Sequence, residues 1–282
     1  MATPCILITG CSSGIGYVTA NLLRAQGWRV FATARNPADV ERLKEEGFEA
    51  YRLDLLEVES INMALDWVLQ QSEGRLDALF NNGAAAWPAA VEDLSYHSLM
   101  VQLGTGLLGW HELTRQVLKV MRRQGHGRII QNSSVLGLVA MAYRGAYVAN
   151  KFALEGLSDV LRLELAGTDI WISLIEPGPI QPTQFRSNAY ENFRQMHLGP
   201  SAHSRAYEAM VRRLESAKPE PFTRPPEAVA RVVWKILNSP RPRARYYVGW
   251  ATWLLATLKR FLPTRLMDAL LLRLSRDERK RY

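Results

Sequence analysis

Residues 4–16 read PCILITGCSSGIG, and this stretch decides the fold of the chain. The apolar run at its start predicts a buried strand, and a helix is predicted over 15–26. Gly10, Gly14 and Gly16 lie at the junction of the two. Glycines at such a turn let a phosphate approach the backbone, and the start of the helix then faces its negative charge. The stretch therefore predicts a nucleotide-binding strand–turn–helix unit.

The same alternation of strands and helices continues along the chain. Apolar runs predict further strands over 28–34, 49–53, 76–80, 127–133, 170–175 and 245–248, and amphipathic spacing predicts helices over 37–46, 58–71, 94–123 and 143–166. Strands separated by helices indicate βαβ units. We expect one doubly wound, Rossmann-type α/β domain with a mostly parallel seven-stranded sheet. Its ligand site should lie beyond the carboxyl ends of the strands.

Length and composition fit this single domain. The chain has 282 residues, of which 48% are hydrophobic and 22% charged, which excludes a disordered chain, a collagen and a disulfide scaffold. Residues 1–245 are expected to form the cofactor-binding and catalytic domain. Within it, 179–225 holds six prolines and is interpreted as a substrate loop or lid, the alternative being a variable surface insertion. Residues 246–282 are expected to be a hydrophobic and basic extension of the same domain.

The distribution of charge and the use of cysteine limit which classes of partner we expect. The net charge of +8 belongs to the last 42 residues, where eleven Arg and Lys face three acids, so a basic nucleic-acid-binding face is not supported. The five His show no metal-ligand spacing, and we expect no metal. Cys5 and Cys11 fit reduced thiols, and the start of the chain has no features of a signal peptide. We therefore expect a cytoplasmic protein.

Three residues around strand 127–133 suggest acid–base chemistry. Tyr147 and Lys151 are four apart on the predicted helix 143–166 and share one face, and Ser134 stands thirteen residues before the tyrosine, at the end of the strand. A phenol has a pKa near 10, and a nearby ammonium group should lower it. Tyr147 could then exchange a proton with a carbonyl or alcohol oxygen, to which Ser134 donates a hydrogen bond.

Together these motifs, over about residues 5–183, resemble the TGxxxGxG and YxxxK patterns of the short-chain dehydrogenases/reductases. The resemblance implies an oxidoreductase in which a nicotinamide cofactor carries the hydride. It also implies that Ser134, Tyr147 and Lys151 are catalytic and that Lys151 holds the nicotinamide ribose. Directly before this lysine the family usually has serine, where this chain has Asn150. The stretch ALEGLSDVLRLEL after the lysine is similar to members that act on retinoid, steroid or long-chain aldehyde substrates.

The resemblance extends to the residues that would bind the cofactor. Asp54 follows a predicted strand where the family has an aspartate at the adenine, and NNGA from Asn81 is similar to the family's NNAG with two residues exchanged. The segment EPGPI is similar to the family's PGxIxT, with the threonine one residue late. The implied set is Gly10, Ser12, Ser13, Gly14, Ile15, Gly16, Asp54, Asn81, Tyr147, Lys151, Pro177, Gly178, Ile180 and Thr183.

Arg35 bears on the choice of cofactor. An acid at the end of the second strand would select NAD, whereas an arginine would pair with the 2′-phosphate of NADP(H). This strand ends in Ala34 and Arg35, so we expect NADP(H). The alternative is that Arg35 only caps the next turn.

Gly106 departs from the family pattern. The family carries an asparagine in N-x-x-G-x-x-x-x-T; here Gly109 and Thr114 fit, and the asparagine position falls on Gly106. A second water or a shifted Gln102 is a candidate substitute, and Gly106→Asn should raise turnover if the missing side chain limits it. The alternative function is a non-catalytic NADP(H)-binding regulatory protein.

The predicted surroundings of the site are apolar. Segments 84–88 and 136–143 carry few polar groups, which suits a lipophilic carbonyl or alcohol unless they are simply core. The uncharged stretch 246–258 is too short for a bilayer, which needs about 20 residues. We interpret it as a last strand and helix that packs on the sheet or on a partner subunit of a homo-oligomer. The alternative is peripheral membrane contact through 246–282.

Overall fold

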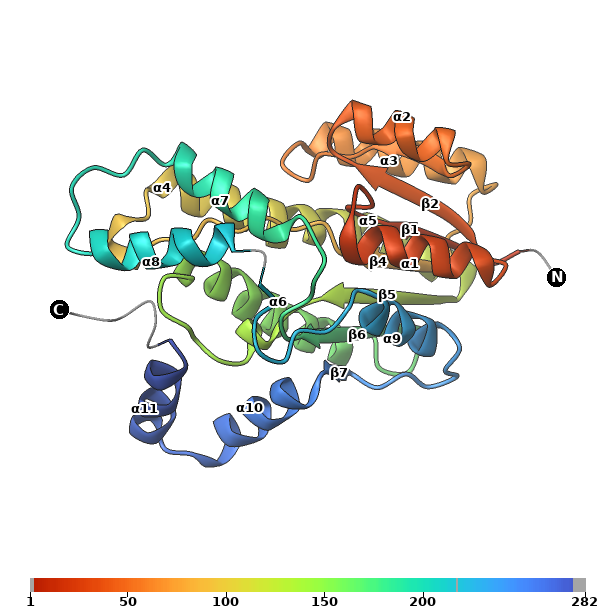
Figure 1. Ribbon diagram of the computed structural model, residues 1–282. Helices are drawn as coiled ribbons and strands as arrows, with labels where there is room; N and C mark the ends of the chain where they lie inside the picture. The colour runs from red at the N-terminus through yellow and green to blue at the C-terminus, as the bar shows by residue number, and fades with distance from the viewer. Residues whose placement is uncertain (1–2, 217, 276–282) are drawn as a thin grey trace.

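A seven-stranded sheet, with strand order β3-β2-β1-β4-β5-β6-β7, forms the centre of the computed structural model, which describes residues 3–216 and 218–275 (Figure 1). All these strands pair in parallel, which confirms the predicted α/β class. The strands are β1 (Cys5–Ile8), β2 (Arg29–Ala34), β3 (Glu49–Arg52), β4 (Ala78–Asn81), β5 (His126–Asn132), β6 (Asp169–Pro177) and β7 (Arg245–Val248).

Helices cover both faces of the sheet. Alternate residues of β1 enter different cores: Leu7 packs on the side of α3, α5 and α6, whereas Ile6 and Ile8 pack on the side of α1, α2 and α9. The helices are α1 (Gly14–Ala25), α2 (Pro37–Glu45), α3 (Val58–Gln71), α4 (Tyr96–Leu103), α5 (Gly109–Gln124), α6 (Gly145–Glu164), α7 (Phe185–Gln195), α8 (Ser204–Glu215), α9 (Glu227–Leu237), α10 (Trp250–Phe261) and α11 (Thr264–Leu274).

Two segments differ in detail from the sequence-based expectation. The helix predicted over 94–123 is divided into α4 and α5 by a π-helical turn, Gly104–Leu108. The segment 179–225, expected to be a loop, contains α7 and α8, which lie beyond the carboxyl ends of the strands in Figure 1. α8 is clearly amphipathic, and both helices pack on one another and on residues 86–90 rather than on the sheet.

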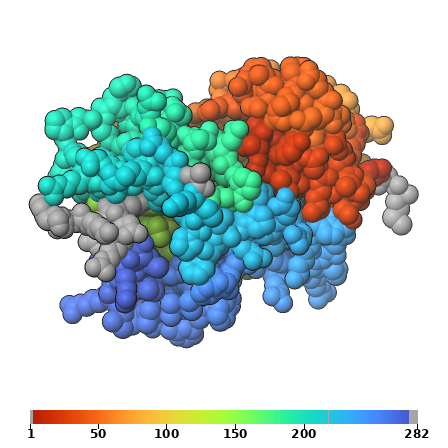
Figure 2. Space-filling view, viewed as in Figure 1, coloured from red at the N-terminus to blue at the C-terminus, as the bar shows by residue number. Residues whose placement is uncertain are grey.

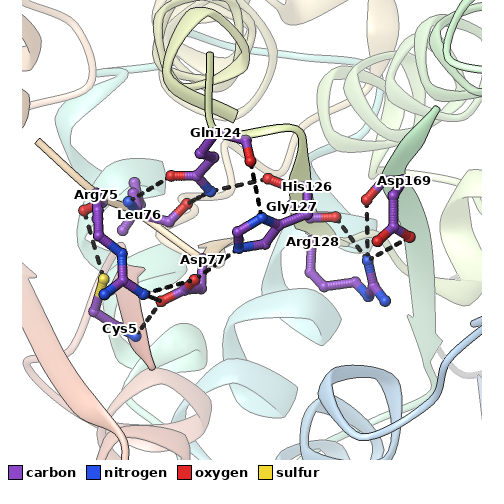
Figure 3. A network of polar contacts seen from close by, with 9 residues as sticks. All are labelled: Cys5, Arg75, Leu76, Asp77, Gln124, His126, Gly127, Arg128 and Asp169. Carbon is purple, nitrogen blue, oxygen red and sulfur yellow. Dashed lines mark hydrogen bonds and ion pairs between the residues drawn. The ribbon is translucent and has the colours of Figure 1, made fainter. Parts of the chain in front are cut away.

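The amino-terminal edge of the sheet is closed by polar contacts (Figure 3). Asp77 accepts a 2.8 Å hydrogen bond from the backbone N–H of Cys5, and His126 Nε2 lies 3.1 Å from the same carboxylate. Burial raises the pKa of Asp77, but these hydrogen bonds outweigh it and hold the pKa below its usual value. Gln124 bonds both the N–H and the carbonyl of Leu76. These contacts tie β1, β4 and β5 together at the edge opposite the predicted site.

The C-terminal helices α10 and α11 pack on the core with one side only. α10 and α11 bury Met267 and Leu271 against Val135 and Val139, which come shortly after β5. The expected boundary at 245/246 falls inside β7, and 276–282 lie outside the described residues. In the part of the chain that the structure describes, no helix has the length and apolar character needed to cross a membrane. In Figure 2 the helices of this segment form the lower rim of the visible face.

Strands β6 and β7 meet at a cluster of one cation and three acids. Arg245 Nη2 lies 3.0 Å from Glu155 and 2.8 Å from Asp159, and Arg245 Nε lies 3.4 Å from Oε1 of Glu176. Glu176 is wholly buried and accepts a hydrogen bond from the N–H of Tyr246. Burial, assisted by the neighbouring Glu155, raises the pKa of Glu176 to about 9 despite the attraction of Arg245. Glu176 therefore keeps its proton at neutral pH.

We predict that Glu176→Gln stabilises the protein at alkaline pH. The folded chain holds a proton that the unfolded chain releases above its ordinary pKa of 4.5, so the free energy of unfolding should fall as pH rises from 4.5 towards 9. Glutamine does not titrate and still accepts from the N–H of Tyr246. In urea unfolding the variant should exceed the wild type by at least about 1 kcal/mol at pH 8–9, with the gap closing towards pH 5.

Asp159→Asn is the matched control, because its hydrogen bond with Arg245 holds the pKa of Asp159 low. This variant should lose stability at neutral pH. Parallel stability–pH profiles for wild type and Glu176→Gln would contradict the assignment of the bound proton.

Candidate active site

The turn after β1 forms a cradle that only glycines fit. Gly10 and Gly14 have φ angles of +72° and +57°, which disfavour other residues. A Cβ at Gly16 would lie 2.2 Å from the carbonyl oxygen of Gly10, and one at Gly10 would lie 2.6 Å from Cα of Gly83. A Cβ at Gly83 would lie 3.3 Å from N of Gly10, so this close approach constrains Gly10 more than Gly83. A Cβ at Gly14 would meet Thr183 at 2.9 Å, so the late threonine does reach the turn.

The turn and the start of α1 fit a phosphate group. Ser13 is the N-cap residue of α1, and its side chain makes no capping hydrogen bond. The N–H groups of the first helical turn, from Gly14 onward, therefore remain available to an anion, as expected at a phosphate-binding helix start. Arg42 of α2 donates a 2.6 Å hydrogen bond to the carbonyl of Ser12 and braces the turn from outside. The sequence did not identify Arg42, because this residue belongs to no recognised motif.

Asn81 and Asn82, at the end of β4, make different contacts. Asn81 is wholly buried, and its amide donates to Thr114 of α5 (2.9 Å) and Gln131 of β5 (3.0 Å), so its side chain is structural. Its neighbour Asn82 contacts the glycine turn: its amide donates to the carbonyl of Gly10 at 3.1 Å. Asn81 stays a predicted cofactor residue, and the side chain that contacts the glycine turn is that of Asn82.

Lys151 is joined to that turn through a chain of hydrogen bonds. Its amine, 1% exposed, donates a 2.7 Å bond to the carbonyl of Asn132 at the end of β5. The side chain of Asn132 donates to Asn82 Oδ1 at 2.9 Å, and Asn82 in turn reaches Gly10. The lysine amine also lies 4.2 Å from the centre of the Trp110 ring, a cation–π distance. Burial lowers the pKa of Lys151 to about 7, opposed by Glu155.

Ser134 and Tyr147 are brought together as predicted. Ser134 lies just beyond β5, where its Oγ accepts the N–H of Leu136 at 3.1 Å, and its hydroxyl is hydrogen-bonded to the phenol of Tyr147 in the first turn of α6. The Tyr147 ring is half-buried and contacts Phe185 of α7 edge-on, with 5.5 Å between ring centres. Lys151 lies on the same helix, 5.6 Å from the Tyr147 ring centre. Serine, phenol and amine thus meet at one edge of the sheet.

The expected effect of Lys151 on Tyr147 is wrong for the chain without cofactor. Burial raises the pKa of Tyr147 to about 12, although the hydrogen bond from Ser134 acts in the opposite direction. Burial also lowers the pKa of Lys151 to about 7, which reduces the average charge of the amine beside the phenol at neutral pH. Tyr147 therefore carries its proton at neutral pH and is arranged as an acid.

The remaining predicted cofactor residues surround the same edge. Asp54 uses Oδ1 to accept the N–H of Leu56, and its carboxylate lies 3.9 Å from Arg52. Pro177 pairs with Val248, and Gly178 donates to the carbonyl of Val248 at 3.3 Å. Further along the same segment, Ile180 bridges to Arg224.

Arg35 is exposed at the end of β2. Within the described part of the chain it has no hydrogen-bond or ion-pair partner. The helix cap after β2 is instead provided by Asn36, whose side chain accepts the N–H of Ala38 at 3.0 Å. The capping alternative for Arg35 is therefore excluded.

Gln102 does not replace the absent asparagine. Its side chain donates to the carbonyl of Ala85 at 2.9 Å and accepts the N–H of Trp87 at 3.1 Å. It thus holds the segment after β4 against α4. Gly106 lies in the buried π-helical turn between α4 and α5.

Known proteins share both this sequence and this fold. The short chain dehydrogenase family matches residues 4–193. The chain is 39% identical over 267 residues to the uncharacterized oxidoreductase YbbO of Escherichia coli (strain K12), covering 94% of this chain and 93% of that protein. It is 30% identical over 267 residues to 3-ketodihydrosphingosine reductase of Bacteroides thetaiotaomicron, covering 93% and 94%. The crystal structure of a short-chain dehydrogenase from Streptomyces avermitilis matches at a TM-score of 0.76 and 26% identity, over 99% and 97% of the two chains. The chain belongs to the short-chain dehydrogenase family of oxidoreductases.

Proposed function

We propose that this oxidoreductase uses NADP(H) to interconvert a lipophilic aldehyde or ketone and its alcohol, with reduction as the favoured direction. The observation that carries the proposal is the hydrogen bond between Ser134 and a protonated Tyr147, directly beside the buried Lys151. NADPH, when bound, supplies the hydride. Tyr147 gives its proton to the carbonyl oxygen, and Ser134 hydrogen-bonds that oxygen as negative charge develops.

Apolar surroundings support a lipophilic substrate. The Tyr147 ring belongs to an apolar cluster. The cluster includes Ala86 from the segment after β4, Tyr143 from the loop before α6, and Phe193 from α7. Asn192 donates to the carbonyl of Ala86 at 2.9 Å, which holds α7 over this segment. Side chains of this kind favour an alkyl chain or fused rings next to the reacting carbonyl. We propose that 179–225 acts as the lid over this substrate.

The first prediction concerns turnover. With NADPH, the wild type should reduce at least one carbonyl among decanal, all-trans-retinal and a 17-ketosteroid. The reaction is measured as the loss of absorbance of the reduced nicotinamide. Tyr147→Phe removes the proton donor and should lower kcat by about 10²–10⁴-fold. The affinity for NADPH, measured by fluorescence titration, should change little.

Tyr96→Phe is the matched control, because Tyr96 is 81% exposed at the start of α4 and lies outside this cluster. It should retain turnover. Tight NADPH binding with no reduction of any carbonyl in the panel would contradict the enzyme proposal and favour a regulatory NADP(H)-binding protein.

The second prediction concerns cofactor choice. Arg35 is an exposed guanidinium without a described partner at the end of β2, which supports pairing with a 2′-phosphate. Arg35→Asp should weaken NADPH binding at least about tenfold, because a charge-assisted hydrogen bond is worth about 1.5–3 kcal/mol. Affinity for NADH should change much less. Arg123→Asp, an exposed change of equal charge on α5, should affect neither, and equal losses for both cofactors at Arg35 would contradict the assignment.

We further propose that the outer side of α10 and α11 contacts an anionic membrane surface. Trp250, Trp253 and Phe261 are 61%, 57% and 77% exposed. Lys259 and Arg260 close α10. Exposed tryptophans beside basic residues are typical of helices that lie in a membrane interface. A lipophilic substrate would be concentrated at the same surface.

This contact predicts binding to vesicles of phosphatidylserine and phosphatidylcholine at low salt. Trp253→Ala and the double change Lys259→Glu, Arg260→Glu should each reduce co-sedimentation, since each basic residue near an anionic surface contributes about 1 kcal/mol. Lys235→Glu on α9 is the charge control and should bind like the wild type. A dimer in size-exclusion chromatography that Trp253→Ala dissociates, without vesicle binding, would instead assign this face to the expected homo-oligomer.

A further inference from the structure

The π-helical turn Gly104–Leu108 stands against the helix that carries Tyr147 and Lys151. A π turn accommodates one extra residue, and such turns are frequent at functional sites. At its centre Gly106 is buried and has no side chain to offer. The residue that faces it comes from α6: a Cβ at position 106 would lie 2.8 Å from Oδ1 and 2.9 Å from Nδ2 of Asn150. The amide of Asn150 thus occupies the space into which a side chain at 106 would project.

Asn150 is held firmly in this place. It is 0% exposed, and its Nδ2 donates a 3.0 Å hydrogen bond to the carbonyl of Gln102, in the last turn of α4 before the π turn. Asn150 therefore connects α4 and the π turn to α6 at the residue directly before Lys151. Its Oδ1 is buried and accepts no hydrogen bond from any described residue. A buried amide oxygen of this kind is costly unless it serves a further partner.

The two departures from the family pattern therefore lie in contact with each other in the structure. The pattern has asparagine at the position of Gly106 and commonly serine at the position of Asn150. We propose that Asn150 is a positioning residue that supplies, from α6, the side-chain amide which the pattern places on the π turn, and that Gly106 is the partner that makes room for it. This inference rests on the proposed function and specifies how Lys151 is positioned for it.

The proposal changes the outcome that we expect for Gly106→Asn alone. An asparagine at 106 would overlap the amide of Asn150. The single change should therefore lower both the melting temperature and kcat. Asn150→Ser alone removes the amide and its bond to Gln102, and should also lower kcat.

The decisive experiment is a double-mutant cycle. We compare wild type, Gly106→Asn, Asn150→Ser and the double variant, using NADPH and the carbonyl of the above panel that the wild type reduces fastest. Each single variant should lose about tenfold or more in kcat, and the double variant should return to within about threefold of the wild type, because contacting residues are not additive. The midpoint of the kcat–pH profile should move in each single variant and return in the double. A merely structural role would leave that midpoint unchanged.

Two controls separate the possible failures. Gly156→Ala, also on α6, meets no atom within 4 Å and should be tolerated, whereas Gly106→Ala should lower the melting temperature. Losses in kcat that multiply in the double variant, or an unmoved pH midpoint, would overturn the role of Asn150 while leaving the oxidoreductase intact. If no protein turns over, including the wild type, the proposed function fails. The cycle in melting temperatures, measured with and without NADPH, then decides the pairing of the two residues: additive losses would overturn it.

Discussion

The candidate site depends on one constraint, the burial of the Lys151 amine at the end of β5. Removing an ammonium group from water disfavours its charge, and in Lys151 this lowers the pKa to about 7. The amine is nevertheless satisfied, because Asn132 accepts its hydrogen bond and the face of Trp110 lies beside it. Through Asn132 and Asn82 the same contacts reach Gly10. The glycine turn and α6 are thus fixed relative to each other.

The two edges of the sheet are used differently. At the amino-terminal edge, Asp77 and Gln124 consume their hydrogen-bonding capacity on neighbouring strands and loops. At the carboxyl edge, the side chain of Ser13 makes no capping hydrogen bond to the first turn of α1, and the phenol of Tyr147 is hydrogen-bonded to Ser134 of the same edge. The sheet can hold both because parallel strands place all their carboxyl ends together. Above that edge, α7 and α8 supply apolar side chains where the strands supply polar ones.

The sequence was sufficient for most of the fold, because a period of two or 3.6 residues records which face is buried. All seven strands and the glycine turn were predictable in this way. α7 and α8 were not predicted, although α8 is amphipathic, because the six prolines of 179–225 favoured a loop. The two helices pack on each other and on the segment after β4 rather than on the sheet. That Ser134, Tyr147 and Lys151 lie close together was predictable from spacing. Asn82, Asn132 and Asn150 were not, because their roles arise from contacts between elements that are distant in the chain.

The contact between Gly106 and Asn150 has a consequence for how such a site can evolve. A chain with asparagine at both positions has two side chains competing for one space, and a chain with glycine and serine has none to fill it. Either single substitution from one arrangement to the other thus passes through a poor intermediate. The two positions should be inherited as a pair, and a search that requires asparagine at the first position alone would discard members in which the second carries it.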